Sequence, residues 1–335
     1  MNPGEYRVPT AQDVWRAHQR IRPWVWPVPL VPSLPLGRVA GGRVALQLEF
    51  LNPVGSFKIR GAAHALVARQ LGGELPGVAT FSTGNHGTAV AYMAQRLGVP
   101  ARVFLPTTVP AVKVAQLQQW GAQVTVSGQT QEDAARRCQE AAGAEGLLLV
   151  PPFDDPDVIA GQGTAGWDLM NRCPDVDTVL VPVSGGGLLS GVALAVKAVH
   201  PAARVIGVGA RHAGSMAASV RAGRPVDAPE APTWADSLLG GVGADNQFTL
   251  ALVRHWVDDL VEVSEEEIVE ALCFLLDHHR LIVEGAAAVG VAALLSGRVT
   301  VGASTAVLLT GNVVEAHRVM QAWQARSEAA PPSET

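Results

Sequence analysis

Short apolar runs that alternate with amphipathic stretches constrain the fold of this 335-residue chain more than any other feature. These runs are typical of β-strands, and a helical stretch separates most neighbours. They are VALQLEF (44–50), VATF (78–81), ARVFLP (101–106), AQVTVS (122–127), LLLVPP (147–152), DTVLVPV (177–183), RVIGVGA (204–210), DLVEV (259–263) and TAVLLT (305–310). Because the runs lack strict apolar–polar alternation, they indicate sheets covered on both faces. The sequence therefore predicts an α/β fold of doubly wound parallel sheets, and its length favours two domains.

Composition excludes several classes of protein. Hydrophobic residues make up 48% of the chain and charged residues 16%, as expected of a globular protein. The net charge of −5, without a stripe rich in lysine and arginine, argues against a nucleic-acid surface. Cys138, Cys173 and Cys273 are widely spaced, which indicates free thiols in a reducing compartment rather than disulfides or a zinc site. The sequence contains no recognisable signal peptide or membrane-spanning run, so we expect a cytoplasmic protein.

Residues 22–37 (RPWVWPVPLVPSLPLG) are rich in proline and tryptophan. Since proline disrupts regular helix, we expect an extended arm that crosses a domain surface. A proline-rich ligand for another protein is the alternative, but the many apolar residues of this segment favour burial.

Three glycine-rich turns follow predicted strands: STGNHG (82–87), SGGGLLSG (184–191) and TGN (310–312). In an open parallel sheet, ligands bind beyond the carboxyl ends of the strands, where such turns lie. One turn of this kind is explained by the tolerance of glycine for tight connections. Three of them, together with a lysine at the start of a further helix, indicate a binding crevice.

The turn SGGGLLSG suits a phosphate group. Consecutive glycines let bare amides converge, and the start of the following helix adds positive potential. The turn lacks the Gly-Lys-Ser/Thr ending of a nucleotide P-loop. It also lacks the spacing of a dinucleotide fingerprint, and the next strand (204–210) ends without an acidic residue for a ribose. A small phosphate-bearing cofactor is therefore favoured over NAD.

The turn STGNHG offers amides, two hydroxyls and Asn85, which suit a small carboxylate. His86 has a side chain that can titrate near neutral pH, although its place at a helix start favours a structural role.

Lys58 lies in the stretch NPVGSFKIRGA (52–62), at the start of a predicted helix over 57–71. If Ser56 caps this helix, Lys58 occupies the first turn, where the helix dipole disfavours a positive charge. Burial would lower its pKa further and supply the neutral amine that Schiff-base chemistry needs. A surface lysine explains this motif, taken alone, equally well.

Lys58 in GSFKIRGA, followed in order by STGNHG, SGGGLLSG and a late Glu-Gly-Ala element, resembles the fold-type II pyridoxal-phosphate enzymes. The chain is most similar to the threonine/serine dehydratase and serine racemase family, over roughly residues 28–312. The stretches PPFDDPDVIAGQGT (151–164), PTWADSLLGGVGADN (232–246) and VEGAAAVGVAALL (283–295) look most like the branch of dehydratases used in hydroxyectoine utilisation. This resemblance implies a tryptophan synthase β-like fold with two doubly wound parallel-sheet domains.

The resemblance implies pyridoxal 5′-phosphate as the cofactor, with Lys58 as the residue that forms its internal aldimine. Thr83 would act at the second face of the substrate α-carbon. Further cofactor contacts would come from Phe57 beside the ring, Asn85 at the 3′-oxygen, Glu284 near the ring, Thr310 at the pyridine nitrogen, and the phosphate loop Ser184, Gly185, Gly186, Gly187 and Leu188. The substrate would be bound by Ser82, Thr83, Gly84, Asn85 and His86.

The implied activity is that of an ammonia-lyase. It would convert threonine, serine or a hydroxyectoine-derived amino acid to a 2-oxo acid and ammonia by β-elimination. Amino-acid racemisation is the alternative, and a non-catalytic sensor of a small ligand is a third. Serine racemases carry a serine where this chain has Thr83, and carboxylates of a metal site where it has Gly209 and Ser215. No metal is therefore predicted.

Other departures from the family pattern are Val54 in place of a threonine and TGNVVE in place of Ser-Gly-Gly-Asn, which makes Asn312 an alternative to Thr310. The family also implies a large cofactor domain (1–75 and 152–325), a small mobile substrate domain (76–151) and a frayed tail (326–335). We expect a homodimer, no nucleic-acid or membrane partner, and no regulatory domain.

Overall fold

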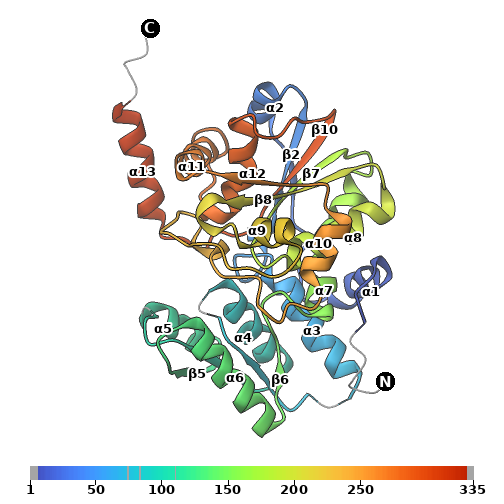
Figure 1. Ribbon diagram of the computed structural model, residues 1–335, viewed down its shortest axis with the longest axis vertical. Helices are drawn as coiled ribbons and strands as arrows, with labels where there is room; N and C mark the ends of the chain where they lie inside the picture. The colour runs from blue at the N-terminus through green and yellow to red at the C-terminus, as the bar shows by residue number, and fades with distance from the viewer. Residues whose placement is uncertain (1–6, 74, 83, 110, 330–335) are drawn as a thin grey trace.

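The computed structural model describes residues 7–329 except for residues 74, 83 and 110 (Figure 1). A six-stranded sheet has the order β1-β2-β10-β7-β8-β9, and a four-stranded sheet has the order β5-β4-β3-β6. Every neighbouring pair is parallel except β1 and β2, which are antiparallel. The predicted α/β class is thus confirmed, with one antiparallel strand added at the edge of the large sheet.

The elements follow one another in close alternation. The strands are β1 (Leu30–Pro32), β2 (Arg43–Leu48), β3 (Val78–Thr80), β4 (Ala101–Leu105), β5 (Gln123–Val126), β6 (Leu148–Leu149), β7 (Thr178–Pro182), β8 (Arg204–Ala210), β9 (Asp259–Val263) and β10 (Ser304–Leu309). The α-helices are α1 (Ala11–Ile21), α2 (Leu34–Ala40), α3 (Lys58–Leu71), α4 (Asn85–Leu97), α5 (Ala111–Gln119), α6 (Gln131–Glu145), α7 (Pro156–Arg172), α8 (Gly187–Val199), α9 (Ser215–Ala222), α10 (Thr249–Trp256), α11 (Glu265–His279), α12 (Gly285–Leu295) and α13 (Ala316–Ala329). Short 3-10 turns span Glu49–Leu51, Arg211–Ala213 and Asp236–Leu238.

Helices cover both faces of the large sheet. Leu36 of α2 and the apolar faces of α11 and α12 pack on one side, against β2, β8 and β10. Helices α7, α8 and α10 pack on the other side, against β7 and β8. This double coverage explains why all six residues of β10 are buried and why its sequence shows no alternation. None of the described helices is long and apolar enough to cross a membrane.

The small sheet is also sandwiched. Helices α3 and α4 pack on one face, where Val78 and Val103 lie, and α6 covers the other face through Ala134 and Cys138. In Figure 1 this sheet and helices α4, α5 and α6 form the lower part of the molecule. The segment Val150–Asp155 leads from β6 back to the large sheet.

The proline-rich segment 22–37 is only partly extended, so the prediction for it is wrong at its end. Helix α2 begins at Leu34, directly after Ser33, whose hydroxyl accepts a hydrogen bond from the amide of Leu36. Pro35 lies in the first turn, where its missing N–H leaves no intrahelical bond unmade. Proline therefore starts this helix instead of preventing it.

Helix α7 packs against its neighbours at main-chain distance. A Cβ added to Gly161 would lie 2.5 Å from the carbonyl oxygen of Arg60 in α3. A Cβ added to Gly163 would lie 2.6 Å from the carbonyl oxygen of Gly191 in α8. Glycine is therefore needed on both sides of α7, which joins α3 and α8 through backbone contact.

A buried ion-pair network lies beneath the start of α3. The guanidinium of Arg60 donates to Glu49 through Nε at 2.7 Å and through Nη2 at 2.9 Å, and Nη2 lies 2.8 Å from Asp168. Gln47 and Asn52 also donate to the Glu49 carboxylate. Burial alone would lower the pKa of Arg60, but the two carboxylates outweigh it and raise this pKa above its ordinary value. The network ties the end of β2 to α3 and α7.

We expect Glu49→Gln to lower the free energy of unfolding by about 3 kcal/mol, because it leaves the buried Arg60 without its bidentate partner. Urea unfolding followed by circular dichroism measures the change. The exposed pair Arg137–Glu140 on α6 provides the control, since Arg137→Ala should leave the unfolding curve unchanged. Equal effects of the two substitutions would contradict this prediction.

Candidate active site

The candidate site lies where the carboxyl ends of strands from both sheets meet. In the large sheet, β10 pairs with β2 on one side and β7 on the other, so the segments that follow these three strands are neighbours. They carry Lys58, the TGN turn and the glycine loop 184–187. The STGNHG turn follows β3 of the small sheet. Segments far apart in sequence are therefore brought together at this end of the two sheets.

Backbone hydrogen bonds join the segment before Lys58 to the TGN turn. The amide of Phe57 donates to the carbonyl of Thr310 at 3.0 Å, and the amide of Asn312 donates to the carbonyl of Gly55 at 3.0 Å. Ser56 forms an antiparallel bridge with Gly311. These bonds fix the backbone from which Lys58 projects.

The predicted capping role of Ser56 is wrong. Phe57, already in a helical conformation, occupies the N-cap position of α3, so Ser56 lies one residue too early to cap. The Ser56 hydroxyl is buried and has no hydrogen-bond partner among the described residues. Lys58 is nevertheless the first residue of α3, as expected, and no acidic residue occupies the first turn.

Lys58 is half-buried, and its amine points to a main-chain acceptor. Its Nζ donates to the carbonyl of Pro152 at 3.0 Å and lies 5.3 Å from the centre of the Phe57 ring. Burial lowers the pKa of Lys58 to about 8, and the carboxylate of Glu284 opposes this shift. A substantial share of the amine is therefore neutral near physiological pH, which is unusual for lysine.

Glu284 and Asn85 connect the two sheets at the site. The Nδ2 of Asn85, at the start of α4, donates to both carboxylate oxygens of Glu284 at 3.1 Å each. Glu284 precedes α12, but its side chain does not cap that helix. Burial raises the pKa of Glu284 to about 7. Its carboxylate also lies against Gly311, where any side chain would clash with it.

The glycine loop leaves its amides free for a ligand. The backbone N–H groups of Gly185, Gly186 and Gly187 donate to no acceptor within the described part of the chain. Gly186 has a left-handed φ of +89°, and a Cβ on Gly185 would lie 2.5 Å from the ring of Phe153. Only glycine fits these positions, and the loop presents bare amides at the start of α8. Ser184 and Leu188 flank it.

The side chain of His86 is hydrogen-bonded to the main chain of the segment after β6. Its Nε2 donates to the carbonyl of Val150 at 3.0 Å, and its Nδ1 is buried without a partner among the described residues. Burial, with a smaller contribution from Lys58, lowers the pKa of His86 to about 3, so the ring is neutral. The structural role favoured by the sequence accounts for these contacts.

Not all of the predicted substrate residues can be placed. The Ser82 hydroxyl accepts from the amide of Gly84 at 3.4 Å, within the same turn. Thr83, predicted to be catalytic, lies outside the described residues. Thr310 is buried, and its carbonyl is used by Phe57.

Sequence reasoning did not identify the role of PPFDDP (151–156). Pro152 provides the acceptor for Lys58, Phe153 packs on the glycine loop, and Asp154 binds amides at the start of α10. The two adjacent aspartates were the signal that could have revealed this role. Asp155 and Pro156 start α7, so helix capping does not explain why Asp154 is also an aspartate.

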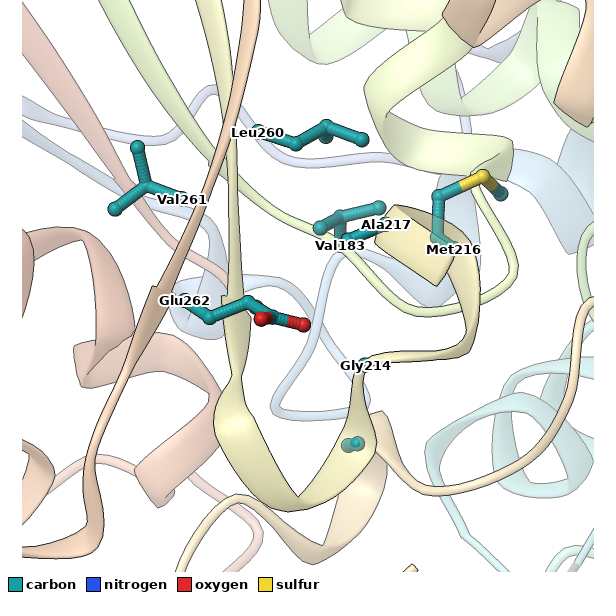
Figure 2. A pocket seen from close by; sticks show the side chains of 9 residues that line it. Val183, Gly214, Met216, Ala217, Leu260, Val261 and Glu262 are labelled. Atoms are coloured by element: carbon teal, nitrogen blue, oxygen red, sulfur yellow. The ribbon is translucent and has the colours of Figure 1, made fainter. Parts of the chain in front are cut away.

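A small hollow adjoins the glycine loop at the ends of β8 and β9 (Figure 2). Val183, Met216 and Leu260 give it apolar walls, and Glu262 is the carboxylate that lines it. Gly209 lines it too, one of the positions where serine racemases are expected to carry metal carboxylates. The described residues include no group of three or more His, Cys, Asp or Glu able to hold a metal ion.

Comparison with known proteins assigns the chain to a class. The family described as "Pyridoxal-phosphate dependent enzyme" matches residues 21–311, and the chain belongs to this family. It is 40% identical over 313 residues to the L-threonine ammonia-lyase of Thermotoga maritima, covering 92% of this chain and 77% of that protein. Solved structures are similar to the chain as well.

The structure of maize serine racemase has a TM-score of 0.88 at 31% identity, covering 96% of this chain and 99% of that one. The crystal structure of the T.th. threonine deaminase has a TM-score of 0.84 at 38% identity, covering 92% of this chain and 99% of that one. The chain is thus a pyridoxal-phosphate-dependent enzyme with the fold-type II architecture.

The residues present fit pyridoxal phosphate. The bare amides of Gly185 to Gly187 suit its phosphate, and the lowered pKa of Lys58 suits attachment to its aldehyde. Asn85, which the family resemblance assigns to the 3′-oxygen, carries an amide donor that Glu284 orients. When bound, the cofactor supplies an electron sink for the α-carbon of an amino acid.

We expect Glu284→Gln to lower the pKa of Lys58 below about 8, because the carboxylate of Glu284 favours the charged amine. Glu284 is ionised above a pH of about 7, so its charge acts in the range where Lys58 titrates. The rate at which the apoprotein binds pyridoxal, followed by absorbance at a series of pH values, gives the midpoint of the Lys58 titration. Glu262→Gln, in the neighbouring hollow, serves as the control and should keep the parent midpoint. An unchanged midpoint in Glu284→Gln would contradict the expected effect of the Glu284 carboxylate on the pKa of Lys58.

Proposed function

We propose that the chain is an ammonia-lyase that converts a small β-hydroxy amino acid, such as threonine or serine, to a 2-oxo acid and ammonia. The observation that carries this proposal is the Lys58 amine, which donates to the carbonyl of Pro152 and whose pKa is lowered by burial to about 8. Relatives named as threonine ammonia-lyase and threonine deaminase support the same activity.

Lys58 is the proposed proton carrier. With the cofactor and an amino acid bound, the free amine of Lys58 would accept the α-proton, and a pKa near 8 would let the same amine hold and then return that proton. The carbonyl of Pro152 orients the amine. The β-hydroxyl would leave as water with the proton that the Lys58 amine returns. The enamine that is released tautomerises to an imine, which takes up one water to give the 2-oxo acid and ammonia.

The remaining groups bind and orient. We assign the phosphate to Ser184, Gly185, Gly186, Gly187 and Leu188. The substrate carboxylate belongs to the amides of the turn that includes Ser82, Gly84 and His86, with Thr83 as a further catalytic residue. Phe57 would pack beside the cofactor ring and Thr310 would face its pyridine nitrogen. Glu284 holds the amide of Asn85, which would contact the 3′-oxygen.

The neutral hydroxyl of Thr310 would not keep the pyridine nitrogen protonated as an aspartate would. The electron sink is then weaker, which favours prompt loss of the β-hydroxyl over a long-lived carbanion. Residues 76–151 form the proposed mobile domain, whose closure over the substrate would exclude water.

Substrate, assembly and location are narrower proposals. The sequences of residues 151–164 and 283–295 resemble those of dehydratases used in hydroxyectoine utilisation. This resemblance favours a hydroxyectoine-derived amino acid as substrate. Exposed apolar side chains, including Trp26 and Leu34, favour a homodimer, which sedimentation would test. We propose a cytoplasmic location, which cell fractionation would test.

We expect Lys58→Ala to reduce 2-oxo-acid release by at least about 10²-fold, because the amine that moves the α-proton is lost. A screen of L- and D-β-hydroxy amino acids, including hydroxyectoine breakdown products, identifies the substrate on the parent protein. Lys113→Ala, which changes a lysine of α5, should keep full activity. Turnover retained in Lys58→Ala, or a parent without a cofactor absorption band, would overturn the proposal.

Racemisation is the second candidate, favoured by the similarity to maize serine racemase. Chiral analysis of serine recovered from the same screen separates the two activities. Unchanged enantiomeric composition with ammonia release supports the lyase alone, whereas loss of enantiomeric purity supports the racemase.

A further inference from the structure

The segment Val150–Asp155 contacts both sheets at the site. It leaves β6 of the small sheet, where the carbonyl of Val150 accepts from Thr80 at 2.8 Å and from His86 at 3.0 Å. It ends at Asp155, whose carboxylate caps α7 by accepting from two backbone amides. Between these ends, Pro152, Phe153 and Asp154 make contacts that a simple connection between β6 and α7 would not require.

Phe153 forms one side of the glycine loop. Its ring would lie 2.5 Å from a Cβ on Gly185, and its carbonyl oxygen would lie 2.9 Å from a Cβ on Gly187. The preceding carbonyl, of Pro152, accepts from Lys58. A loop of three glycines has no side chains with which to pack, so its conformation depends on neighbours of this kind.

Asp154 binds the start of α10 with both carboxylate oxygens. Oδ2 accepts from the amide of Gln247 at 2.6 Å, and Oδ1 accepts from the amides of Phe248 at 3.0 Å and Thr249 at 2.8 Å. A negative charge is favourable at a helix start, and three charge-assisted bonds hold the two segments in one geometry.

The residues joined in this way lie on two sides of the glycine loop. Phe153, covalently next to Asp154, packs on Gly185 and Gly187. The amide of Thr249 donates to Asp154. The Cβ of Thr249 would lie 3.1 Å from a Cβ added to Gly186, so Thr249 flanks the loop on that side. One carboxylate thus links both groups that flank the loop.

We propose that Asp154 is a positioning residue for the cofactor phosphate, acting through Phe153 and Thr249 to hold the amides of the glycine loop in place. The inference rests on the proposed assignment of residues 184–188 to the phosphate. Asp154 itself does not contact the cofactor. Its effect is confined to ligands that carry the phosphate group.

The test compares pyridoxal phosphate with pyridoxal, which lacks the phosphate. In Asp154→Ala the Kd for pyridoxal phosphate should rise about 10- to 100-fold, as expected for loss of hydrogen bonds to a charged group. The Kd for pyridoxal should stay at the parent value. The ³¹P NMR line of bound cofactor should shift or broaden, and Asp154→Asn should show an intermediate effect.

Asp155→Ala is the matched control, because Asp155 lies on the same segment but caps α7. It should lower the thermal midpoint of the protein without changing the ratio of the two Kd values. Phe153→Leu removes the ring and should reproduce the selective loss, which keeps the test decisive if Asp154→Ala does not fold.

Equal weakening of both ligands, or unchanged affinity for pyridoxal phosphate, would overturn the inference and leave Asp154 with a purely structural role. Failure of the parent protein to bind pyridoxal phosphate would instead overturn the proposed function. The two failures are therefore distinguishable.

Discussion

The buried ion pair of Arg60 with Glu49 and Asp168 is the interaction on which the candidate site depends. Arg60 lies two residues after Lys58, and its partners come from the end of β2 and from α7. Breaking a buried pair by removing one partner leaves an uncompensated charge, so the network holds only one arrangement of these three elements. The position of the Lys58 backbone follows from that arrangement.

The site itself is built from strand ends, and its chemistry comes from burial. The TGN turn joins the segment before Lys58 on one side and Glu284 on the other, through backbone bonds of 3.0 and 3.1 Å. An amine and a carboxylate are thereby held in partly or fully buried positions, where desolvation moves the two pKa values toward each other, to about 8 and about 7. Neutral and charged forms of both groups are then accessible near neutral pH.

Local patterns in the sequence were sufficient to predict the strands other than β1 and the three glycine turns, because both are encoded within a few consecutive residues. The patterns failed where the outcome depended on a neighbour distant in sequence. Ser56 has the right residue type for a cap, but its bridge to Gly311 places it one residue too early. Pro35 suggested extended chain, whereas Ser33 allows a helix to start there. The sequence around Asp154 did not reveal its bonds to Phe248 and Thr249, because these partners lie some hundred residues later. The roles of the site residues stay predictions.

The glycine contacts of α7 have a consequence for how such an enzyme can diversify. Because α3 and α8 both touch the backbone of α7, the spacing between the lysine at the start of α3 and the phosphate loop at the start of α8 is set by main-chain atoms. Replacing side chains cannot adjust that spacing. The distance between the start of α3 and the start of α8 is therefore fixed by the backbone. The turn that follows β3 belongs to the other sheet and is not held by the glycine contacts of α7. Substitutions in that turn are therefore compatible with an unchanged position of the Lys58 backbone.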